Sequence, residues 1–261
     1  MVDPNQVLRY IIKHQVQPGE RLPTINDLSV ELGMSVSKVR EELAAARTLG
    51  HIQIKPRLGM QVQPFDFGPA ATLSILYALG LDRTHFHEFA ELRRSVETTF
   101  WHEAVSQLTA EDFADLQTYV TQARLKLTRI PIEVPFTEHR DLHLTFFKHL
   151  QNPFVQGILE AYWAAYKAFG LALYADLSYH RDVWNYHERM VECVASGNYD
   201  AGLQALCEHM DLLRYMPEQH ATDSTASTSS SATSSQSPRT SDNNRDSEVA
   251  ERSSSIRHFF E

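Results

Sequence analysis

The sequence predicts a mainly α protein, with a small N-terminal unit of three helices and a β-hairpin followed by an all-α antiparallel helical bundle. Three observations predict this fold. Residues 1–65 hold three amphipathic segments and then two alternating ones, residues 73–217 repeat apolar side chains every three or four positions, and residues 218–261 are rich in Ser and Thr. We therefore expect a first domain at 1–65, a linker at 66–72, a helical domain at 73–217 and a disordered tail at 218–261.

The first two helices are predicted from local signals. Val7 and Ile11 lie on one face of a short helix, which a Pro-Gly turn at residues 18–19 interrupts. A second helix begins after Thr24, because its hydroxyl precedes the carboxylate of Asp27 by three positions, a variant of the capping box. Gly33 stands where a helix C-terminal glycine is expected.

The third helix and the hairpin complete the unit. Ser35 caps a helix from Val36 to about Leu49, residues 51–55 alternate like a half-buried strand, residues 56–59 turn, and residues 60–63 alternate back. This order is that of a winged helix-turn-helix, whose third helix enters the DNA major groove while the wing brings cations to the backbone. The expected contacts are Ser35, Ser37, Lys38 and Arg40 on the helix and Lys55 and Arg57 on the wing.

A family resemblance adds to this interpretation. It is carried by PGERLPT at residues 18–24, LGMSVSKVREEL at 32–43, GHI at 50–52 and Gly59. In order and spacing these strings resemble the DNA-binding domain of the GntR family of bacterial transcription regulators. The resemblance implies a homodimer on a palindromic operator, with phosphate contacts from the second helix and wing and base contacts from the third helix. It adds Arg21, Thr24 and Gly59 to the expected DNA-binding residues.

Two positions depart from that family. Asn26 and Val36 stand where many members carry arginine. Arginine bound to guanine is the commonest specific contact, so we expect a different operator, with Arg40 as the best remaining candidate for a base or phosphate contact. For any single lysine, an ordinary solvated charge is the simpler interpretation. The ordered set of cations on this pattern favours DNA binding.

Charge and composition limit the possible classes of protein. Residues 1–65 carry a net charge of +2 and residues 66–261 a net charge of −11, so only the N-terminal part is expected to meet a polyanion. Two cysteines are too few for a disulfide scaffold, and no apolar run is long enough to span a bilayer. With no signal peptide recognisable at the N-terminus, we expect a cytoplasmic protein.

Histidines suggest a metal site in the helical domain, where we expect helices at 71–80, 84–108, 110–128, 134–151, 153–176, 179–196 and 198–215. His139 and His143 are spaced i, i+4 and share a helix face. His187 and His209 lie on two helices that antiparallel packing can bring to one level. Converging imidazoles would suit Zn²⁺, Ni²⁺ or Mn²⁺, although a histidine taken alone is more often a surface or core residue.

A second resemblance covers this domain. ELRRSVE at 91–97, Leu142-His143, Asn152-Pro153 and HERMV at 187–191 resemble the FadR C-terminal ligand-binding domain. Many such domains bind a divalent metal through three histidines and an Asp four residues before the first. His139 stands at the Asp position, which would favour Zn²⁺ or Ni²⁺ over Mn²⁺. Alternatively, His139 turns away, water takes its place, and Asp141 or Glu138 supports the site.

The same resemblance implies a small organic acid as effector. Arg93 matches the family's arginine and could pair with a carboxylate, or it could form a salt bridge with Glu97 at i+4. Asn152 could contact the effector or cap a helix. The aromatic run Tyr162, Trp163, Tyr166, Phe169 and Tyr174 is more typical of core or dimer packing than of a ligand cage.

These observations favour a DNA-binding transcription regulator, a repressor that is not an enzyme, whose operator binding responds to a carboxylate bound near a divalent metal. Two alternatives stay open. One is the same regulator with a metal-free apolar pocket for an acyl chain. The other is a metal-dependent hydrolase carrying a DNA-binding module, which lacks a recognised hydrolytic motif near its histidines.

Overall fold

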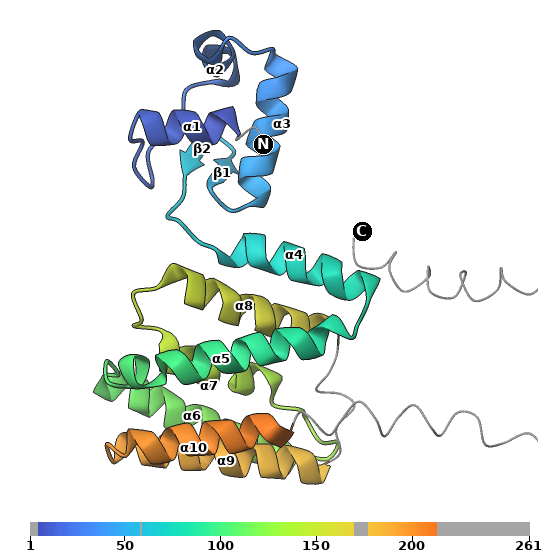
Figure 1. Cartoon of the computed structure of the whole chain (residues 1–261), viewed down its shortest axis with the longest axis vertical. Helices are drawn as coiled ribbons and strands as arrows, with labels where there is room; N and C mark the ends of the chain where they lie inside the picture. Colours follow the sequence, from blue (N-terminus) through green and yellow to red (C-terminus); the bar gives the residue numbers. More distant parts are fainter. Residues whose placement is uncertain (1–4, 58, 170–176, 213–261) are drawn as a thin grey trace, which may run out of the picture. The chain divides into compact units, whose positions relative to one another are not determined.

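The computed structural model describes residues 5–57, 59–169 and 177–212, in which the chain forms ten helices and one two-stranded sheet (Figure 1). The N-terminal unit comprises α1 (Gln6–Lys13), α2 (Ile25–Leu32), α3 (Val36–Thr48), β1 (Ile52–Lys55) and β2 (Gly59–Val62). The expected tail at 218–261 lies outside the described residues. Among those described, no helix is both long and apolar enough to cross a membrane.

The helix ends of the N-terminal unit match their sequence signals. The Thr24 hydroxyl accepts a hydrogen bond from the backbone N–H of Asp27, and the Asp27 carboxylate accepts one from the Thr24 backbone N–H, so the predicted capping box is present. Gly33 closes α2 with a left-handed φ of 62°, and the Ser35 hydroxyl caps α3. These bonds satisfy backbone donors that a helix leaves unpaired, which is why the α2–α3 turn is sharp.

The hairpin forms the predicted wing. β1 pairs antiparallel with β2, Ile52 opposite Val62 and Lys55 opposite Gly59. Arg57 sits in the connecting turn with a φ of 65°. The first strand turns Ile52 inward and exposes its next three residues, whereas the second strand buries Met60 and Val62. Its inward side chains pack with those of the helices in one small core that includes Val7, Leu28, Val39, Leu43 and Met60.

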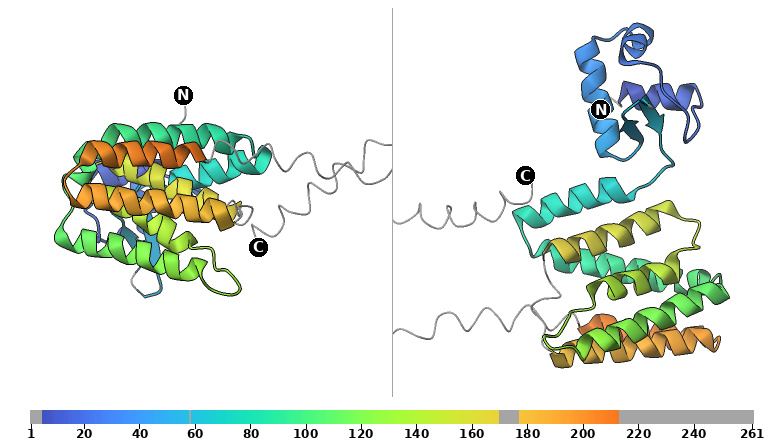
Figure 2. Two further views of the ribbon diagram at one scale, coloured as in Figure 1. Left: turned by 90° about the horizontal axis from the view of Figure 1, so that it is seen from below. Right: turned by 180° about the vertical axis from the view of Figure 1, so that it is seen from behind.

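Seven helices form the C-terminal domain: α4 (Gly68–Leu81), α5 (His85–Val105), α6 (Ala110–Leu127), α7 (Phe136–Phe147), α8 (Pro153–Ala168), α9 (Leu177–Ala195) and α10 (Tyr199–Leu212). Within this domain α4 lies along α8, and α9 lies beside α10 at the opposite side (Figures 1 and 2). The helices α5 and α7 run between these two pairs, with α6 against α7 and α9. The predicted all-α bundle is confirmed, and each helix overlaps its expected range.

The helix α4 begins earlier than the expected start at residue 71. The expected linker extends to residue 72, whereas α4 already begins at Gly68. Pro69 does not prevent this, because proline is favoured in the first helical turn, where its missing N–H has no intrahelical partner. The start of α4 packs closely on α8. A Cβ atom on Gly157 would lie 2.7 Å from the Gly68 backbone nitrogen, so glycine is needed at this crossing.

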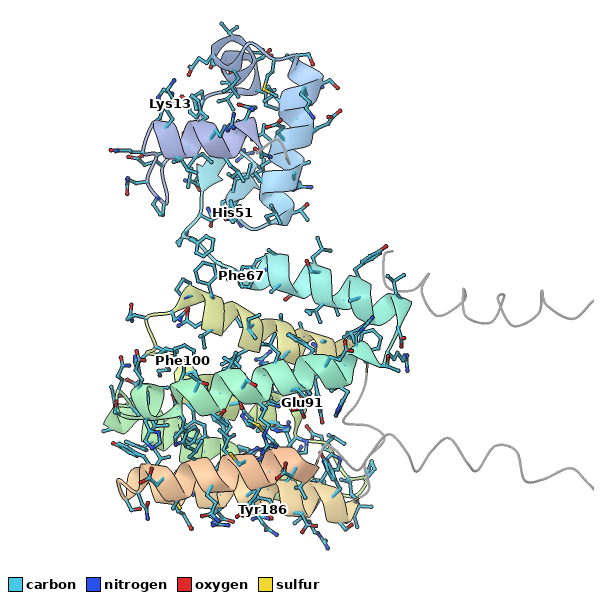
Figure 3. The ribbon with its side chains drawn as sticks, viewed as in Figure 1. Lys13, His51, Phe67, Glu91, Phe100 and Tyr186 are labelled. Atoms are coloured by element: carbon cyan, nitrogen blue, oxygen red, sulfur yellow. The ribbon has the colours of Figure 1, made fainter. Side chains whose placement is uncertain are left out.

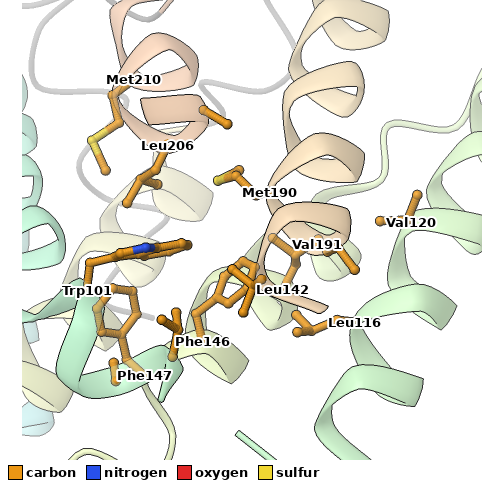
Figure 4. Close-up of a cluster of buried hydrophobic side chains, with 14 of the residues drawn as sticks. Trp101, Leu116, Val120, Leu142, Phe146, Phe147, Met190, Val191, Leu206 and Met210 are labelled. Atoms are coloured by element: carbon orange, nitrogen blue, oxygen red, sulfur yellow. The ribbon is translucent and has the colours of Figure 1, made fainter. Parts of the chain in front are cut away.

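Two apolar clusters fill the bundle, and the side chains occupy the space between the helices (Figure 3). The larger is centred on Trp101, whose ring lies 5.0 Å from that of Phe146 and whose indole N–H donates to the Tyr199 carbonyl (Figure 4). The smaller joins α4 and α5 to α8 through Phe89, Tyr162, Trp163 and other residues.

Candidate functional site

Four histidines meet inside the bundle. His139 and His143 come from successive turns of α7, His187 from α9 and His209 from α10, and all four are buried. Each offers one ring nitrogen so placed that the four atoms lie within 4.8 Å of one another. Within the cluster, His143 Nε2 lies 3.1 Å from His187 Nε2. The antiparallel α9–α10 pairing therefore brings together residues that the sequence spacing only suggested could meet.

The cluster has the donors and the protonation state that a metal site needs. His139 Nε2, His187 Nδ1 and both nitrogens of His209 find no hydrogen-bond partner among the described residues. Burial lowers the pKa of all four imidazoles, and neighbouring positive charge adds to this, chiefly from the other histidines at His139, His187 and His209 and from Arg93 at His143. Neutral imidazole is the form that binds metal, and unpaired buried nitrogens cost free energy unless something satisfies them. The residues present thus fit a divalent ion.

Aromatic rings surround the histidines. The ring centroid of His139 lies 4.6 Å from that of Trp163, and the His187 centroid lies 4.7 Å from that of Trp184. Trp163 and Tyr166 belong to the smaller apolar cluster and Trp184 to the larger, so the four-histidine cluster lies where the two meet. The aromatic run that includes Tyr162, Trp163 and Tyr166 of α8 is expected to pack in the core. Its buried members also form the wall of this polar centre, while Tyr174 lies outside the described residues.

A buried Arg–Glu pair lies behind His143. Arg93 Nε donates to Glu97 Oε1 at 2.9 Å, and its guanidinium stacks over the rings of Tyr162 and Trp163, 4.2 and 5.0 Å from their centroids. Arg93 Nη2 is 3.0 Å from His143 Nδ1, and Glu97 Oε2 is 3.5 Å from the same nitrogen. The i+4 salt bridge considered in the sequence analysis is therefore present, and Arg93 also touches the cluster.

Glu97 is the residue that sequence reasoning missed at this site. It was considered only as a partner for Arg93, whereas the structure places its carboxylate against a cluster histidine. The acidic residues near the histidines in sequence lie elsewhere: Glu138 pairs with Lys126 and Asp141 with Arg140. His139 turns inward rather than away, so the alternative in which Asp141 or Glu138 supports the site in its absence does not match the geometry.

The two proposed effector residues differ in their surroundings. Arg93 is at the cluster, but Asn152 is not. The Asn152 side chain accepts hydrogen bonds from the backbone N–H groups of Phe154 and Val155 and caps α8. It precedes Trp163 by eleven residues, roughly 16 Å along the helix axis. The capping alternative therefore describes Asn152.

A small pocket reaches the cluster at His139. It is lined by residues of α7, α8 and α9 and the loop before α7, among them Phe136, Tyr166, His180 and Trp184. Its volume is about 10 Å³, room for about one water molecule. A larger molecule could reach His139 here only if the aromatic lining moved.

The N-terminal unit presents the second candidate site. All nine residues predicted to contact DNA are exposed: Arg21, Thr24, Ser35, Ser37, Lys38, Arg40, Lys55, Arg57 and Gly59. Lys38 Nζ forms an ion pair with Glu41 Oε2 at 3.3 Å, so the carboxylate partly neutralises the positive charge of Lys38. Arg40 has no ion pair among the described residues. It projects from the N-terminal half of α3, the part of a recognition helix that contacts base edges.

Glu42 holds this helix in place. Its carboxylate accepts hydrogen bonds from the backbone N–H groups of Gln6 and Val7, and its carbonyl accepts one from the Asn5 side chain at 2.8 Å. A carboxylate at the N-terminus of α1 is stabilised by the helix dipole. The orientation of α3 is thus tied to α1, a relationship that helix periodicity alone does not reveal.

Comparison with known proteins identifies the two domains. Residues 5–62 match the family described as "Bacterial regulatory proteins, gntR family", and residues 88–212 match the FCD domain. The chain is 23% identical over 206 residues to the HTH-type transcriptional regulator LutR of Bacillus subtilis, covering 75% of this chain and 90% of that protein. It is also 23% identical over 205 residues to the uncharacterized HTH-type transcriptional regulator YieP of Escherichia coli, covering 75% and 85%.

Among solved structures, the chain resembles Streptococcus agalactiae GntR, with a TM-score of 0.57 and 16% identity over 80% of this chain and 95% of that one. This similarity supports the fold described above.

Proposed function

Because the chain belongs to the GntR family and joins a GntR DNA-binding domain to an FCD domain, we propose that it is a repressor whose binding to operator DNA responds to a ligand at the four-histidine cluster. The families and relatives it matches are transcription regulators, not enzymes, which disfavours the hydrolase alternative. The observation that carries the proposal is the coexistence of an exposed cationic helix start and a buried, unsatisfied imidazole cluster in one chain.

The DNA-binding half of the proposal rests on α3 and the wing. We expect a homodimer on a palindromic operator, with Arg40 at base edges or phosphates and Lys55 and Arg57 on the backbone. The remaining six predicted contacts are Arg21, Thr24, Ser35, Ser37, Lys38 and Gly59. Acting on bacterial DNA, the protein would work in the cytoplasm.

The sensing half rests on the histidines. His139, His143, His187 and His209 would hold a divalent metal, and four nitrogen donors favour Zn²⁺ or Ni²⁺ over Mn²⁺. When bound, the metal would act as a Lewis acid that accepts a carboxylate oxygen from a small organic acid. Among the described residues, Arg93 is the only arginine whose side chain contacts the four-histidine cluster. The pocket at His139 must widen to admit such an effector, because its present volume suits only a water molecule.

Regulation then follows from a difference in affinity. A ligand changes operator occupancy only if it binds more tightly to one conformation of the protein than to another. Opening the aromatic lining around His139 is a change that an effector would favour and that the closed bundle resists. A metal-free acyl pocket is the competing candidate, and the cluster disfavours it because an acyl chain cannot satisfy four inward-facing imidazoles.

One set of experiments tests the proposal. Purified protein is used to select binding sites from fragmented genomic DNA, and the best site is titrated by fluorescence anisotropy with and without Zn²⁺ and a panel of small carboxylic acids. We expect a discrete palindrome and an affinity that changes with at least one acid. Failure to select any discrete site would overturn the DNA-binding half. Elemental analysis decides the metal: no bound ion, even after supplementation, would favour the acyl alternative.

A further inference from the structure

Glu97 occupies an unusual position for a carboxylate. Its side chain is wholly buried in the bundle, and one oxygen is used by Arg93. The other, Oε2, finds no hydrogen-bond partner among the described residues and points to within 3.5 Å of His143 Nδ1. A salt bridge with Arg93 alone would not require this second oxygen to face a histidine of the cluster.

Arg93 Nη2 lies near both ring nitrogens of His143, 3.0 Å from Nδ1 and 3.3 Å from Nε2, but the other neighbours of the two nitrogens differ. Nε2 faces His187 Nε2 at 3.1 Å, so Nε2 is the nitrogen directed at the centre of the cluster. For its lone pair to be available there, a neutral imidazole must carry its proton on Nδ1. A proton on a buried Nδ1 needs an acceptor. Arg93 Nη2 lies 3.0 Å away but is only a donor, whereas Glu97 Oε2 can accept.

We propose that Glu97 is a positioning residue, which accepts the Nδ1 proton of His143 and thereby commits His143 Nε2 to a divalent metal. Carboxylates commonly orient metal-binding histidines in this way, and their loss typically weakens metal affinity 10–100-fold. The inference rests on the metal site of the proposed function. It also bears on Arg93. The positive charge of Arg93 would repel a nearby dication, and the carboxylate of its partner Glu97 offsets that charge.

Two double variants isolate the acceptor. Arg93→Met/Glu97→Gln and Arg93→Met/Glu97→Leu both remove the buried charges, so neither leaves an unpaired ion in the core. They differ in whether residue 97 can accept a hydrogen bond from His143. Zinc dissociation constants are measured by competition with a chromogenic chelator, and the melting temperature of each metal-free protein checks its folding. We expect the leucine variant to bind Zn²⁺ about 10-fold or more weakly than the glutamine variant.

A second measurement needs no variant that could misfold. In zinc-loaded wild-type protein labelled with ¹⁵N at histidine, the ring nitrogen shifts report which nitrogen of His143 carries the proton. We expect the proton on Nδ1, and a proton on Nε2 would overturn the proposal.

The zinc titrations of the double variants have a matched control. Glu103→Gln changes an exposed carboxylate on the same helix and should bind zinc like wild type.

The outcomes distinguish a failure of this inference from a failure of the proposed metal site. If wild type holds zinc tightly and the two double variants hold it equally, Glu97 is not a positioning residue although the metal site stands. If wild type holds no zinc, the metal site itself is absent and the role of Glu97 is overturned with it.

Discussion

His143 Nε2 lies 3.1 Å from His187 Nε2, although 44 residues separate them in the chain. Two nitrogens bound to one tetrahedral zinc ion at about 2.1 Å lie about 3.4 Å apart. The pair is therefore close to the separation that a shared ion would require. It joins α7 to α9 inside the bundle, which makes it the most direct place to test the chemistry of the site.

Removing one of these ligands should remove the stabilisation by metal. With free Zn²⁺ about 100-fold above its dissociation constant, we expect the ion to stabilise wild type by about 2.7 kcal/mol. This should raise its melting temperature by roughly 5–10 °C. His187→Ala should lose most of this gain and retain little zinc after desalting. The control is His102→Ala, which alters an exposed histidine paired with Asp200. Equal zinc stabilisation of His187→Ala and wild type would exclude His187 as a ligand.

The residue at position 139 should set metal preference. His139→Asp replaces a borderline nitrogen donor with a hard carboxylate, so we expect the ratio of Zn²⁺ to Mn²⁺ affinity to fall by about 10-fold or more. Competition titrations with both ions measure the ratio. Glu138→Gln, which changes a neighbouring carboxylate paired with Lys126, should leave it unchanged. An unaltered ratio in His139→Asp would mean that His139 does not bind the ion.

Acid should destabilise the metal-free protein before its carboxylates titrate. Burial, with added positive charge nearby, holds the pKa values of His139, His187 and His209 well below 6.5 in the folded state. Below about pH 6.5 the unfolded chain therefore binds protons that the folded chain does not. The free energy of unfolding thus decreases as the pH is lowered. Three such groups amount to about 4 kcal/mol by pH 5.5.

Urea unfolding in chelator at pH 7.5 and 5.5 measures this loss. The lowered pKa values of Glu97 and Asp112 do not contribute in this range, because carboxylates whose pKa is lowered affect stability only below about pH 4.5. His209→Leu removes one of the three histidines and should therefore reduce the loss of unfolding free energy by about one third. A metal-free wild type equally stable at both pH values would contradict neutral burial of the cluster.

Arg40 should matter more for DNA binding than a neighbouring arginine. Arg40→Ala is expected to weaken operator binding by about 5–150-fold, equivalent to 1–3 kcal/mol, if the side chain reaches a base. If it reaches only a phosphate, the slope of log affinity against log salt should decrease by about one. Anisotropy at several salt concentrations distinguishes the two. Arg47→Ala, in the last turn of α3, is the control, and equal affinities for both variants would exclude Arg40 from the interface.

Two glycine substitutions test the α4–α8 contact. Gly157→Ala should destabilise the protein by about 1–3 kcal/mol, because the added Cβ meets the backbone of Phe67 and Gly68 at under 3.0 Å. Gly80→Ala, in α4 with open space around it, should be neutral or stabilise by about 0.5–1 kcal/mol. Thermal or urea unfolding measures both. A harmless Gly157→Ala would mean that the two helices do not pack this closely.

Local structure was predictable because its causes are local. Thr24 with Asp27, Gly33 and Ser35 are signals that act within one or two turns, and each lies in the structure where its chemistry places it. The i, i+4 spacing of His139 and His143 likewise specifies a shared helix face whatever else surrounds it. Pro69 shows the limit of such local signals. Proline is typical both of a turn and of the first turn of a helix, and here the helix α4 begins at Gly68, inside the expected linker.

The sequence by itself determined the winged unit, the all-α bundle and the four candidate histidines, because helix periods, caps and motifs are written within short stretches of chain. Only the tertiary structure decided that Glu97 lies behind His143, that aromatic residues of α8 enclose the cluster and that Asn152 is remote from it. Periodicity tells which face of a helix is buried but not which helix it meets, and contacts across dozens of residues depend on the packing of whole elements.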